Sequence, residues 1–279
     1  MRPIRFVSAA CLCLALVAGR ADAHEYWLSL DRWIAPVGQP VALSALSGTG
    51  FRGERKPYSP ERVVRLVART GVLLDLRAAT SIGELVWTSF APSDDGGAMF
   101  GYQSTFAPIE LPGDQFDAYL KDEGLDVPLQ TRRSSHTTGI GRERYRRCAK
   151  AWLAGGDVTR ATRPIGMSLE IVPLAAPGAD PKLEVMVLAE GRPLANALVK
   201  AWRAPLDARG MAPDPETRDS TGVVAKVRTD AHGRAIIPIS KPGEWLVSTV
   251  QMVPCRETDV ADWESTWASL TFARMADKP

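Results

Sequence analysis

The chain has few of the features that identify a function at once. Its 279 residues include only four cysteines and three histidines. It has no HExxH, no GxSxG, no phosphate-binding P-loop and no GxGxxG following an expected strand. Beyond an apolar run at residues 6–19, no stretch approaches the ~20 apolar residues of a membrane-spanning helix. We therefore expect no membrane span in the mature chain and no hydrolase or nucleotide site of a motif-defined kind.

Excess charge of either sign is also missing. The sequence has 34 Lys and Arg against 32 Asp and Glu, a formal net charge of +2. Removal of residues 1–23 would take away Arg2, Arg5, Arg20 and Asp22 and leave the two signs in balance. A balanced chain has no broad electrostatic attraction for polyanions. We expect neither nucleic acid nor an anionic membrane surface as a partner.

The N-terminal segment has the order of a secretory signal peptide. Arg2 and Arg5 supply a positive start, residues 6–19 are uncharged and mostly apolar, and an Ala-Asp-Ala sequence ends at Ala23. This order is typical of an exported leader with small residues before the cleavage site. The sequence predicts that residues 1–23 are removed and that the mature protein is periplasmic or secreted.

Cleavage would remove Cys11 and Cys13 and leave Cys148 and Cys255. An even pair in an oxidising compartment usually forms a disulfide, so we expect Cys148 and Cys255 to be joined. A bridge closing a loop of roughly 100 residues would add ~4–5 kcal/mol on the chain-entropy model. A metal site that includes these thiols is the alternative, although neither belongs to a CxxC pair.

The C-terminal part is typical of an antiparallel β-sandwich. Short runs rich in β-branched and aromatic residues alternate with turn sequences that contain Gly, Pro or Asp. These runs are residues 183–188, 197–202, 223–229, 235–239, 244–250 and 266–272. Residues 175–181 have the composition of a connector, and we place a domain boundary just before it, near residue 173. The expected domains are a β-rich one at 24–172 and an immunoglobulin-like sandwich at 173–279.

The N-terminal domain is more mixed but still mainly β. Residues 25–30 and 41–46 are expected strands, and the β-branched residues of 62–68 favour a strand over a helix. Residues 116–124 predict a short helix, because Phe116, Tyr119 and Leu120 share one face and Gly124 can end it. Residues 142–153 fit either a helix or a strand. The fold class expected overall is mainly β, with two sandwich-like domains.

His24 is the candidate ligand with the most specific chemistry. Cleavage after Ala23 would make it the first residue, so that its freed α-amine and its imidazole could bind one metal ion together. Amine and imidazole nitrogens suit Cu, Ni, Co and Zn. The alternative is a histidine that merely follows the cleavage site.

The other two histidines are weaker candidates. His136 lies in a polar stretch after the expected helix, where it is either a second metal ligand or a solvated loop residue. His232 stands in Asp-Ala-His-Gly, which favours a turn between two strands. Glu25 and Asp31 are nearby acidic candidates. Sequence alone therefore predicts a metal site that contains His24, with His136 as the next ligand.

Several segments together resemble the DUF4198 family, exported bacterial proteins related to periplasmic components of nickel and cobalt uptake. The matching segments are residues 23–28, 116–125, 144–150, 168–173, 191–199, 228–234, 242–246 and 262–272. The resemblance implies a β-rich fold whose C-terminal part is similar to immunoglobulin-like or carboxypeptidase-regulatory-like modules, and a metal-related role. His24 matches the family's start motif, whereas Gln251 stands where relatives would carry a histidine.

The sequence thus predicts an exported protein that binds a transition metal, Ni, Co or Cu, for uptake or buffering. A metal-uptake transporter in the envelope is the candidate partner. One alternative is a binding or interaction module of the envelope without a metal. Another is a copper enzyme of the histidine-brace kind, which needs a second histidine facing His24. We expect a binding protein rather than an enzyme.

Overall fold

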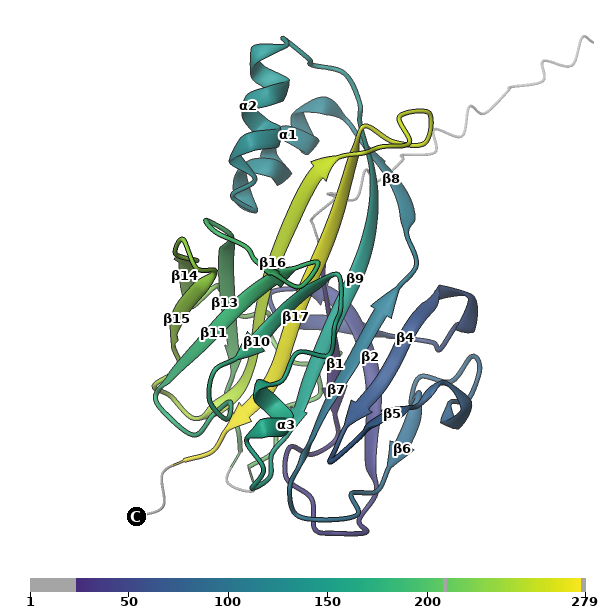
Figure 1. Ribbon diagram of the computed structural model, residues 1–279, viewed down its shortest axis with the longest axis vertical. Coiled ribbons are helices and arrows are strands. Elements are labelled where there is room, and N and C mark those ends of the chain that lie inside the picture. The colour runs from purple at the N-terminus through teal and green to yellow at the C-terminus, as the bar shows by residue number, and fades with distance from the viewer. Residues whose placement is uncertain (1–23, 208–209, 277–279) are drawn as a thin grey trace, which may run out of the picture.

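The protein is mainly β in the computed structural model, which describes residues 24–207 and 210–276 (Figure 1). The predicted leader lies outside the described residues. The largest sheet of the described chain has nine strands. Eight of them follow the order β14 (Ala225–Arg228), β13 (Leu198–Ala204), β16 (Gly243–Pro254), β17 (Trp263–Arg274), β9 (Gly141–Leu153), β7 (Ala98–Ser104), β4 (Val63–Arg69) and β5 (Leu73–Asp75), and β8 (Ala107–Leu111) also pairs with β9.

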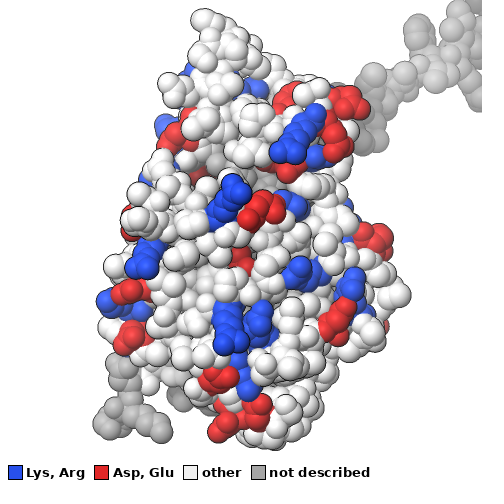
Figure 2. Space-filling view, viewed as in Figure 1, with Lys and Arg blue, Asp and Glu red and all other residues white. Residues whose placement is uncertain are grey.

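Two smaller sheets accompany the large one. The first has β1 (Glu25–Leu30), β2 (Val41–Thr49) and β3 (Arg52–Lys56), with β6 (Thr88–Phe90) on β2. The second has β10 (Leu169–Pro173), β11 (Lys182–Ala189) and β12 (Arg192–Pro193), with β15 (Arg234–Pro238) on β11. On the face in Figure 2, acidic and basic side chains are interspersed, as the balanced composition leads one to expect.

The large sheet lies between the two smaller ones, and β9 shows why. Cys148 and Trp152 belong to the core that contains β10, β11 and β15, whereas Ala149, Ala151 and Leu153 belong to the core that contains β1 and β2. Successive side chains of a strand point to opposite faces. Because both faces of β9 are covered, its second half is an unbroken buried run.

The strand predictions are mostly confirmed. Strands form at every expected C-terminal run, at 25–30 and 41–49, and at 63–69, where strand was favoured over helix. The ambiguous residues 142–153 are strand β9. β9 pairs in parallel with β17, so one sheet contains strands from before and after the predicted domain boundary at 172/173. The mainly β fold class is confirmed, while the division into domains at 172/173 stays a prediction.

The helices are short. They are α1 (Gly113–Asp122), α2 (Asp126–Ser134) and α3 (Thr159–Thr162), with 3-10 turns at Pro60–Arg62 and Arg77–Ala79. The predicted helix is confirmed as α1, which buries Phe116, Tyr119 and Leu120 and is followed by Gly124 in the left-handed conformation, φ +63°. The α1–α2 hairpin stands at one end of the large sheet (Figure 1). No helix within the described ranges is long and apolar enough to cross a membrane.

The predicted disulfide between Cys148 and Cys255 is wrong, because both thiols are free and buried. Cys148 lies opposite Ala268 in the β9–β17 pairing. The Cys255 amide donates to the Asp262 carbonyl, and the Asp262 amide donates to the Arg142 carbonyl. Cys255 is therefore near the Arg142 end of β9, roughly six residues or about 20 Å from Cys148 at ~3.3 Å per residue. A disulfide needs Cα atoms within about 7 Å.

The free thiols lead to a first prediction. In a chain that begins at His24, we expect reductant to leave the thermal unfolding midpoint unchanged, because no covalent loop constrains the unfolded state. Two thiols per chain should react with a thiol reagent after denaturation. A lower midpoint in reductant, of the size that corresponds to ~4–5 kcal/mol, together with missing thiols, would instead establish the bridge.

Candidate functional site

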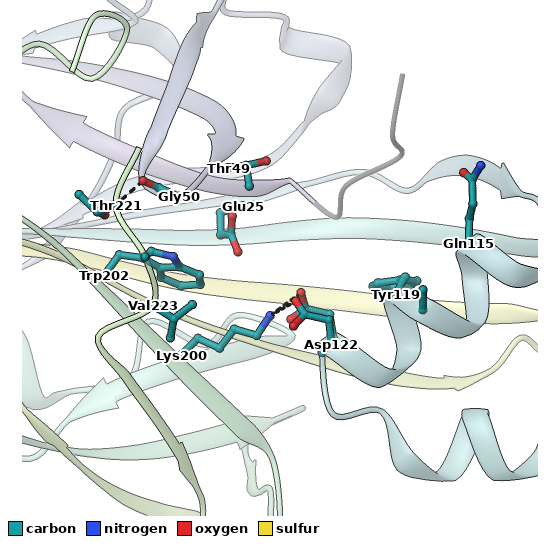
Figure 3. Close-up of a pocket in the computed structure, with 13 residues that line it drawn as sticks. Glu25, Thr49, Gly50, Gln115, Tyr119, Asp122, Lys200, Trp202, Thr221 and Val223 are labelled. Atoms are coloured by element: carbon teal, nitrogen blue, oxygen red, sulfur yellow. Dashed lines mark hydrogen bonds and ion pairs between the residues drawn. The ribbon is translucent and has the colours of Figure 1, made fainter. Parts of the chain in front are cut away.

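A cavity of about 660 Å³ opens where the start of β1 meets α1 and β13 (Figure 3). The turn between β2 and β3 and the segment 221–223 complete its wall. Its lining residues are Glu25, Thr49, Gly50, Gln115, Ala118, Tyr119, Asp122, Glu123, Lys200, Trp202, Thr221, Gly222 and Val223. The site thus combines acidic groups with apolar and aromatic walls.

Glu25 is the unusual group of this cavity. It is the first residue of β1, opposite Gly48 of β2, and its side chain is only 4% exposed. Its Oε2 has no hydrogen-bond partner among the described residues. Burial, with the nearby Glu123 charge, raises the pKa of Glu25 from 4.5 to about 8. The carboxyl group is therefore mostly protonated at neutral pH, because the charges of Lys200 and Arg147 offset the effect of burial only in part.

Lys200 of β13 forms the second charged feature. Its Nζ lies 2.8 Å from Asp122 Oδ2 and 2.8 Å from Glu123 Oε1 at the end of α1 (Figure 3). Burial disfavours the charge of Lys200, but the two carboxylates outweigh it and raise its pKa. These ion pairs hold the end of α1 against the sheet and already neutralise Lys200. The cavity therefore keeps Glu25 as its unpaired acidic group.

Aromatic side chains make the apolar part of the wall. Trp202 comes from β13, two residues after Lys200, so the strand presents both to the same face. Tyr119 comes from α1 and stacks on Trp267 of β17, with ring centroids 5.9 Å apart and planes at 12°. The Tyr119 hydroxyl lies 3.4 Å from Glu143 Oε1. Rings next to a carboxyl group suit a cation or a ligand with a cationic group.

Gly50 allows the chain to close the cavity on the side of the β2–β3 turn. It adopts φ +61°, and its carbonyl accepts a hydrogen bond of 2.7 Å from the Thr221 amide. A Cβ atom at this position would lie 2.9 Å from the Thr221 carbonyl oxygen. Both the left-handed backbone and the close approach require glycine here.

His24 lies at the edge of this site. It is exposed, directly precedes Glu25, and lines a separate hollow with residues that include Arg52 and Glu54. Thr49 lines both that hollow and the larger cavity. The structure thus places the predicted ligand His24 one residue before Glu25 in the chain, in a hollow that shares Thr49 with the cavity.

The other predicted ligand positions lie elsewhere. His136 is exposed just after α2, with φ +52°, in the loop that leads to β9. His232 is an exposed turn residue whose amide donates to Asp230 Oδ1 at 2.8 Å, as expected. Gln251 of β16 lines a different groove. Within residues 24–207 and 210–276, no three His, Cys, Asp or Glu side chains are grouped to hold a metal ion.

Sequence reasoning missed Lys200, Trp202, Glu123 and Tyr119 as site residues. A weak signal existed, because Lys200 is a charged residue inside an apolar strand and therefore needs a buried partner. The partner could not be identified, since Glu123 is distant in sequence and meets Lys200 only through the docking of α1.

Comparisons with known proteins give one clear result. The family model described as "Domain of unknown function (DUF4198)" matches residues 21–253. No curated protein matches the chain. Among solved structures, the D0-D1 domain of intimin is 13% identical, with 88% of this chain and 96% of that chain covered, but the TM-score of 0.19 is too low to support an argument. Because the family model spans most of the sequence, the protein belongs to the DUF4198 family.

Proposed function

We propose that this protein is exported to the periplasm and binds a transition metal ion, Ni, Co or Cu, at a mature N-terminal His24. Its role would be metal uptake or buffering, with a metal-uptake transporter of the envelope as partner. The observation that supports this proposal most directly is the position of His24, which is exposed and directly precedes the strand that begins with Glu25.

The start of β1 is firmly held, which favours a preorganised terminal ligand. β1 pairs with β2 along its whole length. Its Tyr26 and Leu28 carbonyls also accept hydrogen bonds from Ser269 Oγ at 2.7 Å and Thr271 Oγ1 at 2.6 Å. A freed α-amine on His24 would therefore directly precede a strand that is held in place by hydrogen bonds. Fixed ligands lose less conformational entropy on binding.

The ligand chemistry is that of a borderline-soft divalent ion. The α-amine and the imidazole of His24 would supply nitrogen ligands, and Glu25 is a neighbouring source of a carboxylate oxygen. A carboxyl group must lose its proton to bind a metal ion, so a contribution from Glu25 should strengthen as the pH rises toward its raised pKa of about 8. His136 stays a candidate for a further ligand.

The decisive experiment compares a chain that begins at His24 with one that carries an additional N-terminal alanine. The extra residue moves the amine away from the imidazole, and we expect the affinity for Ni²⁺, Co²⁺ or Cu²⁺ to fall roughly 10- to 100-fold or more. Isothermal titration calorimetry measures this directly.

Point variants of the processed chain separate the candidate ligands. His24→Ala should weaken binding, His136→Ala tests the second candidate, and His232→Ala is the matched control because His232 is an exposed turn residue. Equal affinity in the processed and extended chains would exclude the terminal chelate.

A second candidate function is supported by the cavity itself. Its volume and its Trp202 and Tyr119 walls suit a small organic cation whose charged group pairs with Glu25. In that case the chain is a binding module without a metal and His24 is incidental. Such a ligand would bind the processed and extended chains equally and would be lost in Glu25→Gln.

A further inference from the structure

A second cavity, of about 280 Å³, has the opposite charge character. Glu25 lines the first cavity, whereas the next residue of β1, Tyr26, lines the second, because successive residues of a strand face opposite ways. Lys56, Arg62 and Arg147 line this second cavity, and no Asp or Glu is among its lining residues. The remaining lining residues are Tyr26, Ser47, Pro57, Ser59, Val63, Trp87, Tyr102, Ser104 and Tyr145.

Arg147 of β9 is the cation that packs against aromatic rings. Its guanidinium carbon lies 4.9 Å from the centroid of the Tyr145 ring and 4.7 Å from that of Trp267. Its Nη1 is buried and has no hydrogen-bond partner within the described chain. A guanidinium presents five N–H donors in a rigid fork, and a buried donor without an acceptor is costly. An acceptor supplied by a ligand would remove this cost.

Glu143 interacts electrostatically with Arg147 but does not fully neutralise it at neutral pH. Burial raises the pKa of Glu143 to about 7, so a large share of this carboxyl group is protonated. Burial also lowers the pKa of Arg147, which again reflects a charge without sufficient compensation.

The other two cations are held around the same space. Arg62 donates through Nη1 to the Phe106 carbonyl at 3.1 Å, which positions its guanidinium. Lys56 pairs with Glu54 at 3.1 Å, but Glu54 is 83% exposed, so this pair competes weakly with a ligand. The hydroxyl groups of Ser59, Ser104 and Tyr102 already donate to Glu61, the Thr105 carbonyl and the Arg62 carbonyl, so the three cations are the charged donors of this cavity.

We propose that this second cavity is a binding site for a small oxyanion, a carboxylate or a phosphate group. The lining combines positive charge from separate elements with a buried, unpaired guanidinium donor. Guanidinium groups bind carboxylate and phosphate oxygens through strong, charge-assisted hydrogen bonds. The volume suits a compact ligand such as inorganic phosphate or a short dicarboxylate. This inference is independent of metal binding at His24.

Thermal unfolding and calorimetric titration of the chain that begins at His24 test the site. Inorganic phosphate and succinate serve as separate probes, each compared with sodium chloride at the same ionic strength. We expect at least one probe to raise the unfolding midpoint saturably, and the probe that does so distinguishes a phosphate site from a carboxylate site. Arg147→Met should weaken binding about tenfold or more.

Two further variants keep the test valid if Arg147→Met does not fold. Arg62→Met and Lys56→Met remove the other two cations of the cavity and should each weaken binding. Arg69→Met is the matched control, because Arg69 donates to the Pro164 carbonyl outside this cavity. The proposal would be overturned if neither phosphate nor succinate bound saturably. It would also be overturned if Arg69→Met weakened binding as much as the three cavity variants do.

Discussion

Glu25→Gln is expected to stabilise the protein in alkaline solution by up to ~5 kcal/mol. In the folded chain burial raises the pKa of Glu25 to about 8, whereas the unfolded value is near 4.5. Between these pH values the unfolded chain loses the proton and the folded chain keeps it. The free energy of unfolding therefore falls as pH rises through this window, and above pH 8 the folded chain carries a buried carboxylate without a partner. A glutamine has no such charge to desolvate.

Urea unfolding at pH 5 and pH 9 measures this effect. The variant and the parent should differ little at pH 5 and most at pH 9. Glu143, whose pKa burial raises to about 7, acts in the same direction but is present in both proteins and cancels in the difference. Glu54→Gln is the matched control, because Glu54 is exposed. If the variant and the parent differed in unfolding free energy by the same amount at pH 5 and pH 9, Glu25 would have a cationic partner in the folded state.

A buried group that lowers stability needs a reason to be retained, and binding sites are where such costs are usually found. The buried Glu25 carboxyl group is therefore an argument for a binding site at this end of β1. The metal proposal and the organic-cation alternative both use it, and both predict that a ligand stabilises the folded chain most where Glu25 would otherwise be ionised.

The strands were largely predictable from sequence because their side-chain alternation and turn residues are local properties. The exception was residues 142–153, where charged residues fill the first half and apolar ones the second. What makes them a strand is burial between two sheets, and that depends on partners more than 100 residues away in the chain. The helix α2 was missed for a similar reason, since its sequence is polar and its position depends on packing beside α1.

The site was predictable only in part. His24 stood out because its chemistry depends on a cleavage motif, and Glu25 was named as a neighbour. Lys200 and Trp202 could not be assigned, because their role depends on where α1 docks. The disulfide prediction failed for a complementary reason: counting cysteines gives a pair, but the strand register decides whether the two thiols meet.

The buried ion pair between Lys150 and Glu170 should show the largest loss on substitution. Lys150 of β9 is 0% exposed and lies where the large sheet faces β10, with Nζ 2.9 Å from Glu170 Oε1 and 3.0 Å from the Ile171 carbonyl. Lys150→Met would leave the Glu170 carboxylate buried without its cation. We expect the free energy of unfolding to fall by about 3–5 kcal/mol.

Comparison with the double variant distinguishes the cost of the charge from the cost of lost packing. Glu170 also accepts hydrogen bonds from the amides of Ile165 and Gly166 at 2.7 and 2.9 Å, and a glutamine oxygen can replace one of these acceptors. Lys150→Met with Glu170→Gln should therefore recover part of the loss in urea unfolding at pH 7. Lys182→Met removes an exposed ion pair with Glu184 and should cost less than about 1 kcal/mol. If Lys150→Met costs no more than this control, the backbone amides alone suffice to hold the Glu170 charge. The ion pair would then be dispensable for the packing of β10 on the large sheet.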